Sequence, residues 1–543
     1  MSDVLVVGAG HNGLVAACYL ARAGYDVQVV EANAWIGGCT TTAALIDGAP
    51  EHLVNPCAGD VITMRASTVV RDLQLQRHGY HEVDVDPSYV ALGPDGASLA
   101  FWRDPVKTAN EIRRFSERDA RTYLALVRGF DQALDAMLPL MATNPARPDL
   151  RTVMKALAVA ARHPRAIAKV PRLATGSAAQ AIDEHFEHPV VKAGVGMLAN
   201  FGSPITGEGT GAGLMVIALI ARVGMARPVG GLQALPDALA RCLAEHGGRI
   251  RTSARVDEIL VRGGRAIGVR LDDGEELHAR AVLAATAPSV SLNDLLPEGA
   301  LPRAATARAA AIPVANAGCT HFRVDVAVKG RLALPRHDAW RGDGLDLRVP
   351  SAMIGTFDEI VTACASGPAS RWPERPPFVA IVATSTDEES APRGQDCLYL
   401  WMGWAPHDPP EGWDALADRA ADALVARAAE HFENVEELEF ARRVEPWPEI
   451  SARTGVPRGN VYHVDMGLMR QGPLRPALGF GGYKTPLEGF FITGAGTHPG
   501  PSVSGIPGQQ AARVVRRRLG PPAPPSTQEN AWQPASSDLV TSR

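Results

Sequence analysis

The fold is decided by residues 3–31, which read DVLVVGAGHNGLVAACYLARAGYDVQVVE. Residues 4–7 form a continuous apolar run, which is typical of a strand buried on both faces of a parallel sheet. The glycine-rich stretch 8–13 follows, residues 14–23 have helical composition, and Gly24 supplies a helix stop. A second apolar run, residues 27–30, leads to Glu31. The stretch therefore predicts a strand–helix–strand unit with a tight turn after its first strand.

The turn has the spacing of a dinucleotide-binding loop. Gly8 permits the sharp turn, Gly10 lets the backbone approach a pyrophosphate, and Gly13 allows the helix to pack closely on the strand. Glu31 lies 18 residues after Gly13, near the spacing of about 20 for a carboxylate that accepts hydrogen bonds from a ribose. A carboxylate there disfavours NADP. We predict a dinucleotide site that includes the turn residues His11 and Asn12; a glycine-rich turn without a ligand is the alternative.

A second glycine pair favours FAD over NAD. Gly37 and Gly38 follow the acidic residue and resemble the second phosphate-side loop of FAD-binding oxidoreductases of the glutathione-reductase structural type. A simple turn is the alternative. Many proteins of that type place Arg after the pair, whereas this chain has Cys39.

Two distant segments have the order expected of the same flavoprotein type. After the pair Gly230-Gly231, a helix and strands are predicted at residues 249–252, 256–262, 266–271 and 281–285. The resemblance implies that the backbone of Val256 contacts the adenine; from the residues alone, Val256 is a core strand residue.

The third segment, residues 490–508, reads FFITGAGTHPGPSVSGIPG. It predicts a buried strand, a glycine-rich loop and a helix running to about Leu519. The dipole of that helix would stabilise negative charge on a reduced flavin. Its candidate cofactor residues are Gly494, Gly496, Gly505 and Ile506. We assign no catalytic residue, because Tyr483 and His498 are better interpreted as structural, and we see no metal-ligand cluster.

These segments together resemble the phytoene-desaturase-like flavoproteins, a branch related to the amine oxidases, with particular similarity to FAD-type carotenoid ketolases. The resemblance rests on residues 8–14, on GNVYHVDM at 459–466 and on residues 494–508. It implies an α/β FAD-binding Rossmann-like domain built from residues 1–85, 225–300 and 450–520. An α+β substrate domain, residues 86–224 and 301–449, would be interleaved with it. Residues 521–543, which are rich in proline at their start, are predicted to be a disordered tail.

The resemblance implies an enzyme that uses FAD to remove hydride from an apolar, isoprenoid- or carotenoid-like substrate and so forms a double bond. Ketolase-like oxygen insertion, amine oxidation and a non-catalytic flavin-binding scaffold are the alternatives. Oxygen or a quinone would accept the electrons. A dedicated NAD(P)H site is not expected, because the chain has no second GxGxxG of comparable quality.

Composition limits the remaining classes. The chain has 54 Lys and Arg against 59 Asp and Glu, a net charge of −5, which argues against a nucleic-acid binder. Its 7 cysteines contain no CxxC pair, which favours reduced thiols in the cytoplasm and argues against a dithiol relay beside the flavin. The longest apolar run, residues 213–221, is too short to span a bilayer.

One segment suggests contact with a membrane surface. Residues 151–182 contain six basic residues and no Asp or Glu, and apolar residues are interleaved with them. This pattern resembles an interfacial amphipathic helix or helix pair through which a lipid-soluble substrate enters. A solvated basic face packed on the substrate domain is the equally weighted alternative.

Overall fold

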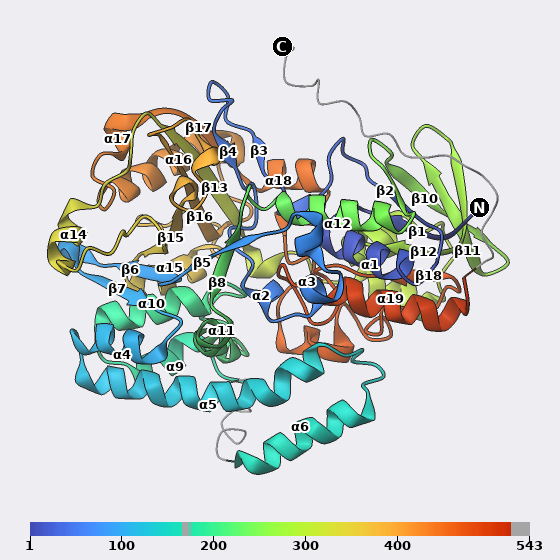
Figure 1. The fold of residues 1–543 in the computed structure, drawn as a ribbon, viewed down its shortest axis with the longest axis horizontal. Helices are drawn as coiled ribbons and strands as arrows, with labels where there is room; N and C mark the ends of the chain where they lie inside the picture. Colours follow the sequence, from blue (N-terminus) through green and yellow to red (C-terminus); the bar gives the residue numbers. More distant parts are fainter. Residues whose placement is uncertain (165–172, 174, 523–543) are drawn as a thin grey trace.

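Strands from three separate parts of the chain form the first large sheet in the computed structural model, which describes residues 1–164, 173 and 175–522 (Figure 1). The strand order is β10-β11-β12-β1-β2-β9, and β18 pairs with residues 282–284 of β12, beyond the part of that strand that pairs with β11. The pairings among β18, β12, β1, β2 and β9 are parallel, whereas β10 and β11 extend the sheet antiparallel. The strands are β1 (Ser2–Val7), β2 (Val27–Val30), β9 (Arg249–Arg251), β10 (Val256–Arg262), β11 (Arg265–Leu271), β12 (Glu276–Ala284) and β18 (Phe490–Ile492).

Alternate residues of this sheet face two different cores. Val4 and Val6 pack with the helices α1 (His11–Ala21), α12 (Ala234–Glu245) and α19 (Ile506–Leu519). Leu5 and Val7 pack on the other face, where α13 (Arg303–Ala310) contributes. Because both faces are covered, the strands are continuously apolar, as a parallel sheet requires.

The second large sheet has the order β17-β13-β16-β15-β14-β6-β7. Its strands are β6 (Tyr89–Leu92), β7 (Ser98–Phe101), β13 (Cys319–Val328), β14 (Ser351–Ile354), β15 (Phe378–Val382), β16 (Asp396–Pro406) and β17 (Glu439–Glu445). One face packs on a helical layer and the other on α16 (Trp413–Ala429). The layer, below the sheet in Figure 1, consists of α4 (Pro105–Arg113), α5 (Glu117–Met141), α9 (Ala178–His185), α10 (Pro189–Ala199) and α11 (Val216–Val223).

Two crossings of the chain between the sheets lie side by side. The strand β5 (Glu82–Val85) pairs antiparallel with β8 (Met225–Pro228), so that Val85 is opposite Met225. These strands stand at the expected domain borders 85/86 and 224/225; the domain boundaries themselves stay a prediction. The remaining elements include β3 (Ala43–Ala44), β4 (Leu53–Val54), α2 (Ile62–Arg65), α3 (Val69–Asp72), α6 (Leu150–Arg162), α14 (Pro335–Arg341), α15 (Phe357–Ser366), α17 (Val435–Leu438) and α18 (Trp447–Thr454).

The first helix begins earlier than the sequence predicts. The expected range was 14–23, but α1 starts at His11 and ends at Ala21. A Cβ at Gly13 would lie 2.1 Å from the carbonyl oxygen of Gly8, so only glycine lets the first helical turn rest on the strand end.

The expected disordered tail and the expected basic segment each lie partly outside the described residues. Of the tail expected at residues 521–543, everything from residue 523 on lies outside the described residues, as do residues 165–172 and 174 of the basic segment. Among the helices that the structure describes, none is long and apolar enough to cross a bilayer.

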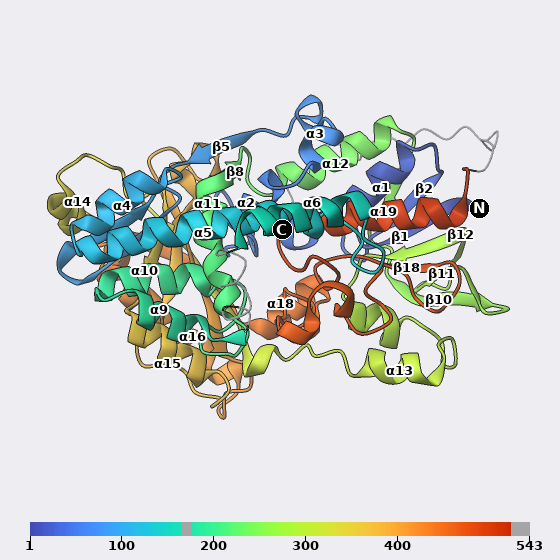
Figure 2. The same ribbon diagram turned by 90° about the horizontal axis from the view of Figure 1, so that it is seen from below.

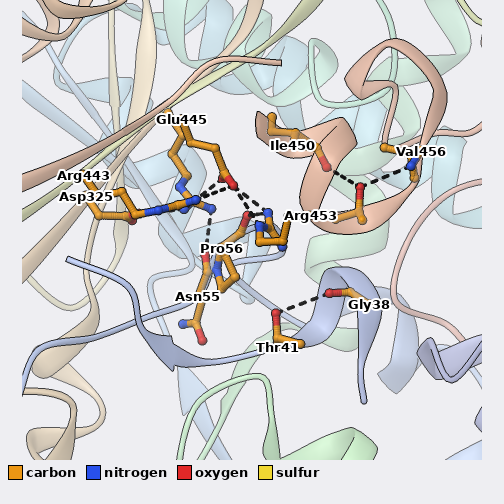
Figure 3. A network of polar contacts seen from close by, with 12 residues as sticks. Gly38, Thr41, Asn55, Pro56, Asp325, Arg443, Glu445, Ile450, Arg453 and Val456 are labelled. Atoms are coloured by element: carbon orange, nitrogen blue, oxygen red, sulfur yellow. Dashed lines mark hydrogen bonds and ion pairs between the residues drawn. The ribbon is translucent and has the colours of Figure 1, made fainter. Parts of the chain in front are cut away.

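A buried ionic cluster joins the second sheet to α18 (Figure 3). The carboxylate of Glu445 on β17 accepts hydrogen bonds from Arg443 at 2.6 Å and Arg453 at 2.8 Å. It also forms a 3.1 Å ion pair with Arg323 on β13, which in turn pairs with Asp325 at 2.6 Å. The side chains of Arg323 and Glu445 are 2% and 1% exposed, so solvent screens their interaction very little.

The cluster separates the pKa values of its two acids. Burial alone raises the pKa of Glu445, but the charges of Arg323, Arg443 and Arg453 outweigh it and lower the pKa to about 2. Burial raises the pKa of Asp325, and the nearby arginines offset this only in part. We attribute the difference to hydrogen bonding, because one oxygen of Asp325 has no partner among the described residues.

We expect Glu445→Gln to destabilise the protein by about 3 kcal/mol at pH 7, since the pKa of this carboxyl lies well below its value of about 4.3 in an unfolded chain. That contribution is present above about pH 4.3 and is lost as the pH falls toward 2. Urea unfolding of wild type and variant at several pH values would measure it. Glu117→Gln, which removes an exposed ion pair with Arg113, should cost less than about 1 kcal/mol. A stability gap for Glu445→Gln that does not change with pH would contradict this assignment.

Candidate active site

A cavity of about 380 Å³ lies where the carboxyl ends of the first sheet's parallel strands meet the second sheet. The first sheet contributes the residues that follow β1, β2, β12 and β18, and the second contributes residues of β13, β16 and β17. Open parallel sheets bind their ligands beyond the carboxyl ends of the strands. The volume is within the range of cofactor and substrate sites.

The glycine-rich turn forms one wall of this cavity, and its glycines have the steric roles expected from the sequence. Gly8 has a φ of +101°, a conformation that disfavours a side chain. A Cβ at Gly10 would meet no atom within 4 Å, so the backbone there is open to close approach. Gly10 precedes α1 and caps it with no side chain, which leaves the first N–H groups of the helix free for an anion.

Most of the cofactor residues expected from the sequence meet at the cavity. Those that line it are Gly8, Gly10, His11, Asn12, Gly13, Glu31, Gly38, Val256 and Gly494. The carboxylate of Glu31 accepts hydrogen bonds from the N–H groups of Ala9 at 2.8 Å and Asn33 at 2.9 Å. These two bonds aim the carboxylate at the turn, and its oxygens retain lone pairs for further donors.

Four of the expected residues lie behind the lining instead. Gly37 donates a backbone hydrogen bond to Ala9 at 2.9 Å. A Cβ at Gly496 would collide with Pro288, and one at Gly505 would lie 3.1 Å from Val15, so both glycines serve close packing. Ile506 is the buried first residue of α19. The residues that precede this helix, 501–503, do line the cavity.

Unpartnered polar atoms at the cavity wall fit a polar ligand. Among the described residues, the Oδ1 of Asn12 and the Nδ1 of His463 are buried and have no hydrogen-bond partner. Both residues line the cavity. Buried polar groups in proteins are nearly always satisfied, so these two atoms indicate a ligand with complementary groups.

His463 is a site residue that the sequence did not single out, although it lies in the recognised stretch 459–466. Its backbone has a φ of +63°, which is uncommon for a residue with a side chain. The guanidinium of Arg475 holds this conformation, because it donates to the carbonyls of Tyr462, Val464 and Ala495 at 2.9–3.1 Å. Arg475 therefore ties the segment that carries His463 to the loop after β18.

An aromatic group from the substrate side forms another part of the wall. Trp401 on β16 stacks on His321 of β13 at a centroid distance of 5.6 Å and donates a 3.1 Å hydrogen bond to its Nδ1. Tyr462 meets His321 edge-on at 5.2 Å, and Phe201 lies 6.0 Å from Trp401. No local sequence pattern predicts this group, because its members are far apart along the chain.

The cavity lining holds neutral histidines together with the charged residues Glu31, Arg255, Arg323, Glu445 and Arg453. Burial lowers the pKa of His11 and His321 to about 4, and that of His463 to about 3, so all three are neutral at pH 7. Arg323 and Arg453, which also line the cavity, are ion-paired with Asp325 and Glu445. On the side of the second sheet, the lining is therefore made of neutral rings and ion-paired groups.

Two cysteines that are far apart in the sequence meet at this cavity. Cys39 and Cys57 both line it, and the N–H of Ala58 donates a 3.2 Å hydrogen bond to the carbonyl of Cys39, which brings the two residues close enough for each thiol to shift the pKa of the other. The cysteine spacing argued against a dithiol relay beside the flavin, and that expectation stays a prediction, although two cysteines without CxxC spacing do lie together here. Chain folding creates the contact, which spacing alone does not reveal.

Tyr483 and His498 have the structural roles expected of them. The hydroxyl of Tyr483 is buried and donates a 2.7 Å hydrogen bond to the carbonyl of His498. Burial lowers the pKa of His498 to about 4. Neither side chain lines the cavity.

Comparison with known proteins identifies the family. Residues 99–508 match the flavin containing amine oxidoreductase family, and residues 6–74 match an NAD(P)-binding Rossmann-like domain. The chain is 29% identical to pyridine nucleotide-disulfide oxidoreductase domain-containing protein 2 of Mus musculus, covering 95% of this chain and 94% of that protein. It is 28% identical to the zeta-carotene-forming phytoene desaturase of Myxococcus xanthus, covering 95% and 93%.

A solved structure has the same fold. Cyclohexylamine oxidase from Brevibacterium oxydans superposes with a TM-score of 0.57 at 17% identity, covering 95% of this chain and 99% of that one. The expected Rossmann-like FAD-binding fold with a substrate domain, and the expected phytoene-desaturase-like relationship, are confirmed. The chain belongs to the flavin containing amine oxidoreductase family, as an FAD-dependent oxidoreductase.

Proposed function

We propose that this enzyme removes hydride from an apolar, isoprenoid-like substrate and so forms a carbon–carbon double bond. FAD, when bound, supplies the hydride acceptor at N5 of its ring. The observation that carries the proposal is the aromatic wall on the side of the second sheet, where His321 is neutral and the neighbouring arginines are ion-paired. A relative of similar length, the Myxococcus xanthus phytoene desaturase, supports the same substrate class.

The chain's own residues would hold the cofactor by backbone groups and one carboxylate. The free N–H groups at the start of α1 would face the pyrophosphate. Glu31 would accept hydrogen bonds from the adenosine ribose, and the backbone of Val256 would meet the adenine. Gly38 and Gly494 would leave room for the remaining part of the cofactor. His463 would present its imidazole to the cofactor from the loop that Arg475 holds.

The substrate would lie against the aromatic group formed by Phe201, His321, Trp401 and Tyr462. These rings supply broad apolar contact, which positions a hydrocarbon without requiring a charge. The histidines that line the cavity are neutral, so none of them would act as a cationic acid at pH 7. Chemistry in this cavity would therefore depend on orientation of the substrate and on exclusion of water.

Amine oxidation is the second candidate, favoured by the fold shared with cyclohexylamine oxidase. An ammonium substrate would need an uncompensated carboxylate or a cation-binding ring face. Glu445, an acid in the cavity lining, is already paired with three arginines. This pairing favours the neutral substrate, whereas the rings of the aromatic group would accept either substrate.

Anaerobic titration of the holoenzyme separates these functions. We expect an isoprenoid hydrocarbon in detergent micelles to bleach the visible flavin band, and a primary amine of similar length to leave it unchanged. Product analysis should then show an added double bond. A ketone product would favour oxygen insertion, bleaching by the amine alone would favour amine oxidation, and an unreactive flavin would favour a scaffold. Readmission of oxygen or a soluble quinone would identify the electron acceptor.

Two glycine variants test the cofactor site. Gly10→Ala places a methyl group in open space, so the FAD-free chain should keep its thermal stability while FAD binds at least tenfold more weakly, about 1.4 kcal/mol. Gly13→Ala places its methyl group against the Gly8 carbonyl and should cost about 1–3 kcal/mol of stability even without FAD. Thermal unfolding and fluorescence titration with FAD measure the two effects. Equal FAD affinity in Gly10→Ala and wild type would contradict the placement of the pyrophosphate.

We further propose that α6 contacts an anionic membrane surface. This helix lies at the edge of the molecule beyond α5 (Figures 1 and 2). Leu150, Met154 and Leu157 share one face of it and are 72%, 57% and 57% exposed. Arg151, Lys155 and Arg162 are also exposed. Solvent-exposed apolar residues flanked by basic ones suit a lipid interface.

Co-sedimentation with phosphatidylserine vesicles at low salt tests the membrane contact. Neutralising Arg151, Lys155 and Arg162 with Gln should weaken binding about a hundredfold, since each basic residue near an anionic surface contributes about 1 kcal/mol. The matched control replaces Arg516, Arg517 and Arg518, which are exposed on α19, and should bind as wild type does. Equal loss in both variants would indicate a non-specific charge effect and contradict the α6 surface.

A further inference from the structure

The thiols of Cys39 and Cys57 form a pair that the proposed hydride transfer does not use. Cys39 lies in the short turn Gly38–Thr40 after the second glycine pair. Cys57 lies in the segment that leads toward α2. The N–H of Ala58 donates a 3.2 Å hydrogen bond to the carbonyl of Cys39, so the two backbones run next to each other. Both residues are partly exposed and line the cavity.

The surroundings of the pair hold it in place and polarise it. The hydroxyl of Tyr399 donates to the carbonyl of Cys57 at 3.1 Å, and Arg453 donates to the neighbouring carbonyl of Pro56 at 2.8 Å. The hydrogen bond from Cys57 lowers the pKa of Cys39, and the charge of Arg453 acts in the same direction. The same hydrogen bond raises the pKa of Cys57. One thiol is thereby favoured as the nucleophile and the other keeps its proton.

A second cysteine pair shows what is particular about the first. The thiols of Cys18 on α1 and Cys242 on α12 also shift each other's pKa, while they donate hydrogen bonds to the carbonyls of Leu239 and Leu73. Both are fully buried in the core between these helices, and neither lines the cavity. In both pairs the two thiols influence each other. The pairs differ in that Cys39 and Cys57 can be reached from the cavity, whereas Cys18 and Cys242 cannot.

We propose that Cys39 and Cys57 form a redox-active dithiol site that reacts with small disulfides entering the cavity. The Cys39 thiolate attacks one sulfur of the small disulfide, forms a mixed disulfide and releases one thiolate. Cys57 then gives up its proton to solvent and attacks the Cys39 sulfur, which releases the second thiolate and closes the Cys39–Cys57 bond. The two protein thiols are oxidised, and the small disulfide is reduced to two thiols.

A Cys39–Cys57 disulfide would link the loop after β2, which contains Cys39, to the segment before α2, which contains Cys57. Both of these segments contribute to the cavity wall. The bridge would thus change the environment of the cofactor, a consequence that rests on the proposed FAD site, whereas formation of the bridge does not.

The test treats the holoenzyme with 2-hydroxyethyl disulfide and maps its cysteine peptides by mass spectrometry without reduction. We expect a Cys39–Cys57 linked peptide to form at least tenfold faster than a Cys18–Cys242 linked peptide. In Cys57→Ser, Cys39 should stop at the mixed disulfide. Persistent free thiols at both positions, or equal rates for the two pairs, would overturn the proposal. A Cys39 thiol that stays free in Cys57→Ser, without forming the mixed disulfide, would also overturn it.

A spectroscopic measurement keeps this site distinct from the cofactor placement. We expect the flavin band to shift when the Cys39–Cys57 bridge closes and to return when dithiothreitol opens it. A bridge that forms without any spectral shift would support the dithiol site and contradict the placement of FAD beside it.

Discussion

The pairing of β12 with both β1 and β18 is the constraint on which the site depends. The N–H of Ala285 donates to the carbonyl of Val7 at 2.8 Å, and the N–H of Thr493 donates to the carbonyl of Ala284 at 2.8 Å. These bonds align three strand ends from distant parts of the chain in one row. The turn at Gly8, the segment after Ala285 and the loop at Gly494 consequently open toward the same cavity. The cofactor site therefore depends first on the register of these strands, which places the three loops together, and only then on individual side chains.

The second sheet supplies what the first lacks, which is a wall of side chains. β13 and β16 present His321 and Trp401, and the cluster around Glu445 fixes β13, β17 and α18 at the border of the cavity (Figure 3). Buried ions are costly unless each is paired, and this cluster pairs arginines with acids where the two sheets meet. Ion-paired groups at the border and neutral rings beside them together form the wall of the cavity on this side.

Local patterns predicted the parts of the fold that depend on neighbours in sequence. The range of β2 and that of β10 agree with the expected strands, because apolar runs bounded by turns determine both. The roles of Gly8, Gly10 and Gly13 followed from steric rules that need no tertiary contact. The grouping of Cys39 with Cys57, of Glu445 with three arginines, and of His321 with Tyr462 did not. Each depends on the relative placement of two sheets, which no short stretch encodes.

The strand order also has a consequence for how the enzyme is made. β1 ends at Val7 and β18 begins at Phe490, so the ribosome adds about 480 residues after β1 before the sheet can gain β18. At about 5–20 residues per second, this delay is roughly 25–100 s. During that interval the edge of β12 that β18 later covers has no partner from its own sheet. The cavity wall that follows β18 can therefore form only after this delay, and nascent chains depend on other means to avoid aggregation until β18 arrives.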